Sequence, residues 1–279
     1  MLKFKKHYKL TLALVCMLFT AVAANASVES TPITLETAKN IGLAKEYKEA
    51  EEDSSKLNMR IDAMKEAALS YGAQSGAIYR NWEIAKIINK QETILDTVFN
   101  FSRLMIPTHY GALIEPPIVS ENENSFLLGE RGMSASMTSK TYSIGENVKI
   151  VTTPKNWRRY LLDHIDLTAA EKPDIILRPR DKSERKTWKK YVKIGWDNGV
   201  DQANDVFSEN LALLLADYKG MIRYRKLLAQ KMISEPFAVK ENRGITGNAN
   251  ELRIDDKAII ITSIPALNKS SDAWEPTER

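Results

Sequence analysis

The strongest constraint on the fold is a pair of long stretches without proline, residues 57–104 and 184–231. In the first stretch, apolar side chains recur in steps of three and four from Ile61 to Ala85, which is the spacing of one helix face. The second stretch carries a similar apolar face that begins at Trp188. The pattern predicts one or two helices in the first stretch and a long helical region in the second.

Each stretch also contains a Gly-x-x-x-Gly motif, at Gly72 and Gly76 and again at Gly195 and Gly199. Glycine costs a helix about 1 kcal/mol relative to alanine, so two glycines on one face predict close packing against another backbone. Transmembrane helix pairs use the same spacing, but charged residues surround the first motif. A contact between helices of a soluble domain is therefore the favoured interpretation.

Short β-type runs between and after the helical stretches predict hairpins. TYSI and VKIVTT flank Gly145-Glu146-Asn147, which indicates a hairpin with a short turn. Beyond Pro236 the runs FAV, ELRI and KAIIIT are also strand-like, and the last two are joined across Asp255 and Asp256. The expected fold class is α+β, with long helices packed on an antiparallel β-sheet made of hairpins.

Two further helix starts are predicted from capping chemistry. Thr153-Pro154 is typical of an N-cap followed by proline at the first helical position, so a short helix is expected through Trp157. Ser183 is expected to cap the long second helix, with Lys186 in its charged first turn.

A short motif occurs twice. Residues 115–122, EPPIVSEN, and residues 235–242, EPFAVKEN, are identical at five of eight positions. Each copy follows a helix with Gly-x-x-x-Gly and precedes a predicted hairpin, so we hypothesise two repeated helix–hairpin units, at 57–154 and 184–265. A chance match is the alternative. True repeats predict that the two hairpins share one sheet and that the two glycine faces meet.

The N-terminus has the layout of a cleavable secretory signal. Lysines precede an apolar run, and the small side chains of Ala24 and Ala26 predict cleavage before Ser27, which makes residues 1–26 the signal peptide. The run is roughly 14 residues, shorter than the ~20 that span a bilayer, so an uncleaved anchor is disfavoured. Cys16 is preceded by Val15 and so lacks the small residue that lipid attachment requires.

Removal of the signal changes the charge balance. The chain has 40 lysines and arginines against 36 acidic residues, and four of the lysines lie in the signal. The mature chain is thus near neutral, and direct nucleic-acid binding is not expected. It also loses Cys16, the single cysteine, so disulfides are not expected. Residues 27–56 are polar and predicted to be flexible, 57–267 form the folded domain, and 268–279 form a C-terminal tail.

Searching the sequence for catalytic chemistry gives little. His109 and His164 have no metal-ligand spacing, and no Gly-rich phosphate loop or GxSxG occurs. Glu209 is a conceivable acid for a glycan-cleaving enzyme, but nothing in the sequence marks its partner. Tryptophans that could line a sugar cleft are more simply explained as core residues. We therefore expect no catalytic, cofactor-binding or metal-binding residues, no cofactor, and no enzyme activity.

Four segments, in this order along the chain, resemble one known family: AALSYGAQSGAIYRN, TTPKNWRRYLL, WKKYVKIGWDNGVDQANDVFSENLALLLADYKGMIRYRKLLAQ and GITGNANELRI. The similarity runs from Leu57 to Leu267 and is to the DotC family, subunits of the outer-membrane core complex of Dot/Icm-type (type IVB) secretion systems and of IncI-like conjugation systems. The resemblance implies a structural subunit in a hetero-oligomeric ring. Its expected partners are a DotD-like subunit and the DotH-like channel subunit, which it helps to place in the outer membrane.

DotC proteins are usually lipoproteins, and Cys16 departs from that pattern, so attachment to the outer membrane is expected to depend on partners. A periplasmic location follows from the signal and the resemblance. The alternative function is a periplasmic peptidoglycan-active enzyme that accompanies such a system. A solute-binding module would need an alternating strand–helix pattern, which is not seen.

Surfaces for partner contact or close helix packing are expected at the residues singled out above. On the helices these are Gly72, Gly76, Trp82, Gly195, Trp196 and Gly199, where packing in the protein's own core is an equally good interpretation. In the repeated motif they are Glu115, Pro116, Glu235 and Pro236, which are favoured for contacts because they lie at the ends of elements.

Overall fold

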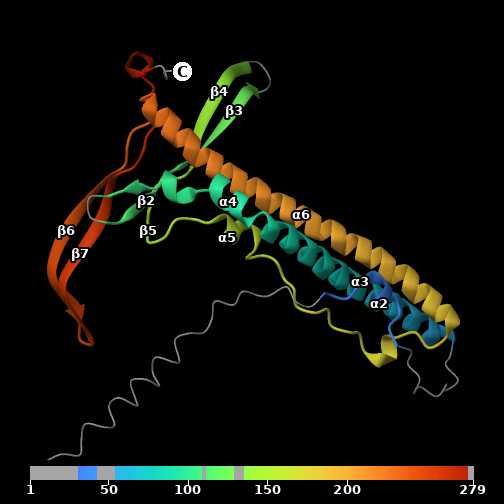
Figure 1. Cartoon of the computed structure of the whole chain (residues 1–279). Coiled ribbons are helices and arrows are strands. Elements are labelled where there is room, and N and C mark those ends of the chain that lie inside the picture. Colours follow the sequence, from blue (N-terminus) through green and yellow to red (C-terminus); the bar gives the residue numbers. More distant parts are fainter. Residues whose placement is uncertain (1–30, 43–53, 109–110, 129–134, 276–279) are drawn as a thin grey trace, which may run out of the picture.

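The computed structural model describes residues 31–42, 54–108, 111–128 and 135–275. Two long helices, α3 (Ser54–Lys90) and α6 (Lys182–Ala229), form the scaffold, and small antiparallel sheets lie around the C-terminal half of α6 (Figure 1). This arrangement confirms the predicted α+β class. In the described part of the chain, no helix is long and apolar enough to cross a membrane.

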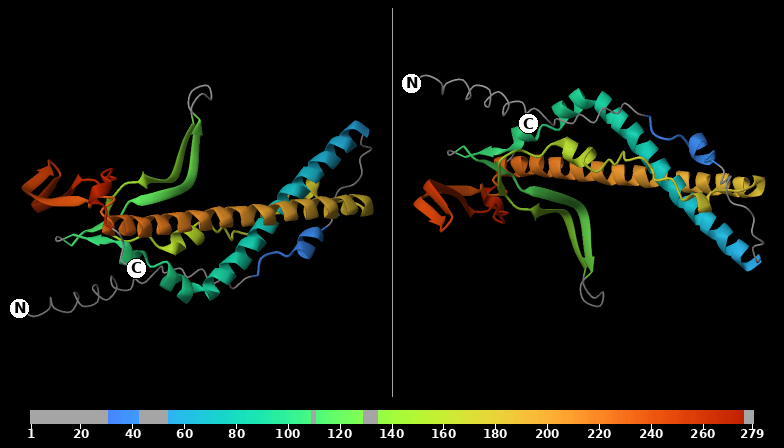
Figure 2. Two further views of the ribbon diagram at one scale, coloured as in Figure 1. Left: turned by 90° about the horizontal axis from the view of Figure 1, so that it is seen from above. Right: turned by 90° about the horizontal axis from the view of Figure 1, so that it is seen from below.

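The two long helices cross obliquely rather than run side by side along their lengths (Figure 2). Helix α6 begins where the Asp181 side chain accepts a hydrogen bond from the backbone N–H of Glu184, so the cap is Asp181 and not Ser183 as predicted. The Glu184 carboxylate also forms an ion pair with Arg60 of α3, which ties this end of α6 to α3.

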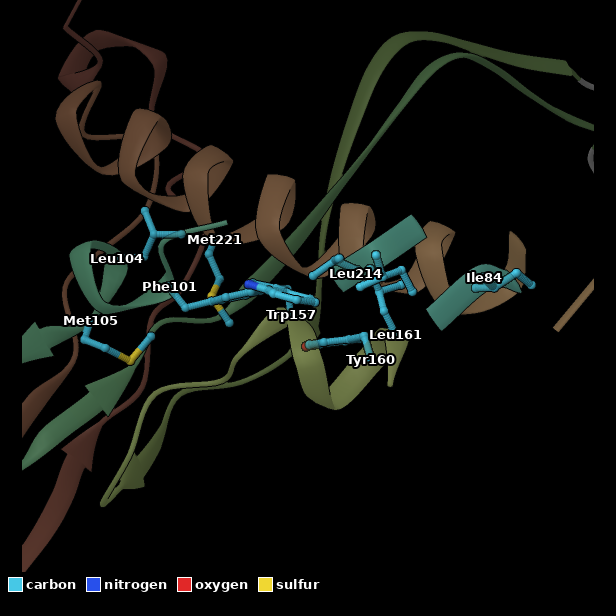
Figure 3. Packing of buried hydrophobic residues seen from close by; sticks show 10 residues of the cluster. Ile84, Phe101, Leu104, Met105, Trp157, Tyr160, Leu161, Leu214 and Met221 are labelled. Atoms are coloured by element: carbon cyan, nitrogen blue, oxygen red, sulfur yellow. The ribbon is translucent and has the colours of Figure 1, made fainter. Parts of the chain in front are cut away.

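Short elements fill the angle between the long helices. They are α4 (Glu92–Val98), the 3-10 helix η1 (Phe101–Leu104), and α5 (Trp157–Leu161), whose N-cap is Asn156 and not Thr153. Figure 3 shows Trp157 lying among Phe101, Leu214 and Met221, and the Trp157 indole donates a 2.8 Å hydrogen bond to Asp96. This apolar cluster joins α3, α5, η1 and α6 into one core.

A second apolar cluster lies at the opposite end of α6. Within the segment predicted to be flexible, residues 33–41 contain the short helix α2 (Leu35–Lys39), and its Ala38 is fully buried against Met64 and Trp188. The Trp188 indole donates to the Ala38 carbonyl at 3.4 Å. This part of the N-terminal segment therefore packs on both long helices. The 3-10 helix η3 (Ile175–Leu177) lies near the same end.

Within the described residues, the strands form three separate sheets. Strands β1 (Ile106–Pro107), β2 (Leu113–Glu115) and β5 (Lys149–Val151) form one sheet. Strand β3 (Ile118–Leu128) pairs with β4 (Ala135–Glu146), and β6 (Phe237–Asn248) pairs with β7 (Glu251–Ser263). The predicted hairpin around residues 145–147 is wrong, because β4 ends there and the chain passes to a different sheet. ELRI and KAIIIT are parts of the single strand β7.

The two hairpins do not share a sheet, which contradicts the prediction drawn from the repeated units. Each is a two-stranded ribbon of its own, and the ribbons project from α6 in different directions (Figures 1 and 2). The base of β3 packs against α6, whereas β6 and β7 pair only with each other among the described strands. The tail reaches η4 (Ser271–Ala273) and lies beside the end of α6, where the Glu275 N–H donates to Gln230.

Candidate protein–protein interface

The four motif glycines lie where α3 crosses α6, and all four are buried. A Cβ atom on Gly199 would lie 2.0 Å from the Ala73 carbonyl oxygen, and one on Gly195 would lie 2.1 Å from that of Leu69. From the other side, Cβ atoms on Gly72 and Gly76 would lie 2.3 and 2.4 Å from backbone oxygens of α6. The two glycine faces therefore meet each other, and neither is available to a partner.

The neighbouring tryptophans flank this crossing. Trp196 is 8% exposed and its ring lies 5.4 Å from that of Tyr79. Trp82 is half-buried, 5.9 Å from the Tyr79 ring, with the Lys86 ammonium 4.8 Å from its own ring centre. Trp196 is therefore a core residue, while Tyr79 and Trp82 are partly exposed.

The first copy of the repeated motif is buried. Glu115 is 3% exposed and forms ion pairs with Lys155 at 3.1 Å and with Lys149 at 3.4 Å, and Pro116 behind it is also buried. Lys155 in turn pairs with Asp217 of α6 at 3.0 Å. This charged group holds the start of the first hairpin against the core and leaves it no free surface.

The same charged group includes Tyr160, whose hydroxyl donates a 2.6 Å hydrogen bond to Asp217. Burial and this hydrogen bond raise the pKa of the Tyr160 hydroxyl. Burial acts to lower the pKa of Lys155, but the hydrogen bond to Asp217 and the neighbouring Glu115 raise it above its ordinary value. The Asp217 carboxylate therefore accepts hydrogen bonds from both the Tyr160 hydroxyl and the Lys155 ammonium. Sequence gave no signal for this cluster, because an acidic residue on a long helix usually faces solvent.

The second copy of the motif is in a different environment. Glu235 is exposed and Pro236 is half-exposed. They lie beside a surface hollow of about 450 Å³ at the end of α6, lined by Leu228, Lys231, Ile233, Ser234, Glu235 and Asn268. The two copies thus differ: the first is part of the core and the second is at the surface.

The β6–β7 hairpin that follows the second copy is amphipathic near its tip. Ile245 pairs directly with Ile254 across the ribbon, and Leu252 lies two residues from Ile254 on the same face. These three side chains are 70%, 74% and 70% exposed, in the order Ile245, Ile254 and Leu252. The opposite face carries polar side chains, among them Thr246, whose hydroxyl donates a 2.7 Å hydrogen bond to Asp256.

The β3–β4 hairpin also exposes apolar side chains at its outer end. Phe126 and Met137 pair across the ribbon and are 56% and 83% exposed. Its other face carries hydroxyl side chains, such as Ser120 and Ser143, whose oxygens lie 2.6 Å apart. Apolar side chains exposed in this way on narrow ribbons mark surfaces for protein contacts.

Among the described residues, no group of three or more His, Cys, Asp or Glu side chains is placed to hold a metal ion. Glu209 and His164 are exposed, and Trp157 and Trp188 are buried in the two cores. His109 lies outside the described residues, as do Cys16 and the predicted cleavage site at Ala24, Ala26 and Ser27.

The described residues thus form a helical scaffold that carries two ribbons with exposed apolar side chains. The chain belongs to the TraI family of type IV secretory systems, described as conjugal DNA-protein transfer, which matches residues 58–276. A comparison with curated proteins found no match. The family membership agrees with the resemblance seen in the sequence at the level of type IV secretion and conjugation, so the chain is a component of such a system.

Proposed function

We propose that this protein is a structural and assembly subunit of the outer-membrane core complex of a type IVB secretion or conjugative transfer system, similar in role to DotC. Its function in this proposal is to help place and hold the outer-membrane channel subunit. The observation that carries the proposal is the pair of ribbons with exposed apolar faces, held on a helical scaffold whose own core is complete. Membership of a conjugal transfer family supports the same role.

The proposal includes a location and partners. The protein acts in the periplasm, at the outer membrane, in a hetero-oligomeric ring with DotD-like and DotH-like subunits. It reaches the membrane through these partners, because Cys16 lacks the residues that lipid attachment requires. It has no enzyme activity and uses no cofactor. A subunit of a ring presents two unlike faces to its neighbours, and two separate ribbons meet that need.

Membrane fractionation tests the proposal. We expect the protein to sediment with the outer membrane when the whole apparatus is produced, and to remain soluble when the DotD-like and DotH-like genes are deleted. Detergent extraction of the complete strain should release it in a particle far larger than its own 31.5 kDa. Recovery as a free monomer from the complete strain would contradict the proposal.

A further inference from the structure

The two hairpins share a pattern of strand pairing near their bases, although they lie in different sheets. In the first, Val119 pairs with Ile144, and in the second Val239 pairs with Ile260. The motif alignment that matches Val119 with Val239 also matches Asn124 with Gly244, and both of these have left-handed backbone, with φ of 52° and 70°. The valine–isoleucine pair and the left-handed residue thus recur at corresponding positions, and from the valine to the glutamate two residues later the strands are paired without a shift in both ribbons. The valine and this glutamate therefore lie on equivalent faces of the two ribbons.

In the first hairpin, helix α6 covers one of these faces. Val119 is fully buried there with Tyr224 and Leu227. Gly220 allows the close approach, since a Cβ atom on it would lie 2.6 Å from the Ile118 side chain and 3.2 Å from the Val119 nitrogen. The helix therefore contributes a small residue at the contact and apolar residues four and seven positions later.

Arg223, three residues after Gly220, completes this contact. Its guanidinium donates to the Val119 carbonyl at 2.6 Å and to the Glu121 carboxylate at 3.0 Å. Glu121 also accepts from Lys140 and Tyr142, and the hydrogen bonds from Lys140, Arg223 and Tyr142 lower its pKa. The first hairpin thus recognises a helix through an apolar pair and a carboxylate that faces an arginine.

In the second hairpin the equivalent face is exposed. Val239 and Ile260 are 41% and 40% exposed, where Val119 is fully buried. Glu241, which corresponds to Glu121, has a side chain that is 54% exposed and lies 3.6 Å from Arg243 of its own strand. Within the described part of the chain, helix α6 packs on β3 and has no comparable packing on β6 or β7, so it leaves this face open.

We infer that the β6–β7 hairpin binds a helix of another protein on the face formed by Val239, Glu241 and Ile260, as β3–β4 binds α6. The partner helix presents a small residue, an arginine three positions later, and apolar residues four and seven positions after the small one. The arginine pairs with Glu241. This inference rests on the proposed function in that the partner is another subunit of the same apparatus.

The partner helix belongs to a different protein rather than to a second copy. In the described helices α3 and α6, a small residue is followed three positions later by arginine at Ala77/Arg80 and at Gly220/Arg223. The first pair lies in the crossing, where Arg80 donates to Asn204 and the Ala77 nitrogen would lie 2.9 Å from a Cβ on Gly199. The second already binds β3–β4. Both pairs are therefore engaged within their own chain.

Site-specific photo-cross-linking in the strain with the whole apparatus tests this inference. A photoreactive amino acid replaces Val239, and a matched control replaces Lys240, which lies on the opposite face of the same strand. We expect the Val239 adduct to map by mass spectrometry to a partner helix with the small residue and the arginine.

Charge reversal tests the proposed ion pair. Glu241→Arg should reduce the yield of the Val239 adduct roughly tenfold, and reversal of the partner's arginine to glutamate should restore that yield. Glu251→Arg, a charge reversal near the tip, should leave it unchanged.

Several results would overturn the inference. The Val239 adduct could map to a strand or loop, or to α6 of a second copy. The yields from Val239 and Lys240 could be equal. Finally, Val239 could give no adduct in a chain that sediments in the large particle. In that last case the proposed function stands and only this surface fails. A chain that is a free monomer in the complete strain, and gives no adduct, would overturn both.

Discussion

At the scale of single residues, the helix crossing depends on the absence of side chains at four positions. We expect Gly199→Ala to lower the free energy of unfolding by about 1–3 kcal/mol, the usual cost of overpacking. The added Cβ would lie 2.0 Å from a backbone oxygen of α3, which cannot move aside as a flexible side chain would. This overlap outweighs the roughly 1 kcal/mol that alanine gains over glycine in a helix.

Gly42→Ala is the matched control for this experiment, because a Cβ atom at Gly42 would meet nothing within 4 Å. Its effect should stay within about 0.5 kcal/mol. Urea unfolding of both variants measures the difference. Equal stabilities would show that the crossing relaxes more easily than its backbone contacts indicate.

The buried charged group around Asp217 makes a second prediction, on pH. The folded chain raises the pKa of both Tyr160 and Lys155, so it holds their protons more tightly than the unfolded chain. Their contribution to stability is full below the ordinary values, 10.0 for tyrosine and 10.5 for lysine, and is lost as the pH rises further. The free energy of unfolding should therefore fall steeply above about pH 10.

Tyr160→Phe tests the assignment of this pH dependence, because it removes one of the two titrating groups and keeps the ring in the core. We expect the variant to be less stable at pH 7 and to lose less stability between pH 9 and pH 11, as measured by urea unfolding. Identical slopes for the variant and the natural protein would exclude Tyr160 as a source.

At the scale of elements, the two hairpins should differ in stability before assembly. An isolated two-stranded ribbon is marginally stable in water, and β6–β7 is exposed on both faces along most of its length. The base of β3–β4 is held on α6 by Val119, Glu121 and Arg223. We expect amide hydrogen exchange to be faster in β6–β7 than in residues 118–122 and 141–144 in the isolated protein, and to slow in β6–β7 within the assembled particle.

Mass spectrometry after deuterium labelling measures both states, with α3 and α6 as internal references whose exchange should not change on assembly. Protection of β6–β7 in the isolated chain equal to that of the β3–β4 base would contradict the prediction.

The long helices were predictable from sequence, while the strand pairing was not. Proline-free amphipathic stretches determine α3 and α6 through local spacing, and their glycines indicated a close backbone contact. The turn-like Gly145-Glu146-Asn147 indicated a hairpin, but strand pairing depends on distant partners: β5 pairs with β2, and β4 with β3. Likewise, the two similar copies of the motif gave no reason for Glu115 to be buried and Glu235 exposed, since that depends on Lys155 and α6.

At the scale of the whole molecule, α6 is the element on which most of the described helices and the first hairpin pack. Its N-terminal half packs with α2 and α3, and its C-terminal half packs with α5 and with the first hairpin. The second hairpin leaves its C-terminal end (Figure 1). Helix α6 thus fixes the first ribbon relative to the core, while the second ribbon follows its C-terminal end without packing extensively on it.

This arrangement predicts that folding and assembly can be separated by mutation at the ribbon tip. Ile254→Ser removes an apolar side chain that is 74% exposed, so the thermal stability of the isolated protein should change by no more than about 0.5 kcal/mol. The same variant should no longer be incorporated into the large particle and should reduce transfer, because the apolar face that it disrupts is available to a partner.

Met59→Ser is the matched control, since Met59 is also 74% exposed but lies near the start of α3. Thermal unfolding, particle sedimentation and transfer frequency should all be near natural levels for Met59→Ser. Equal assembly defects in the two variants would show that exposed apolar area in general, and not the β6–β7 tip, governs incorporation.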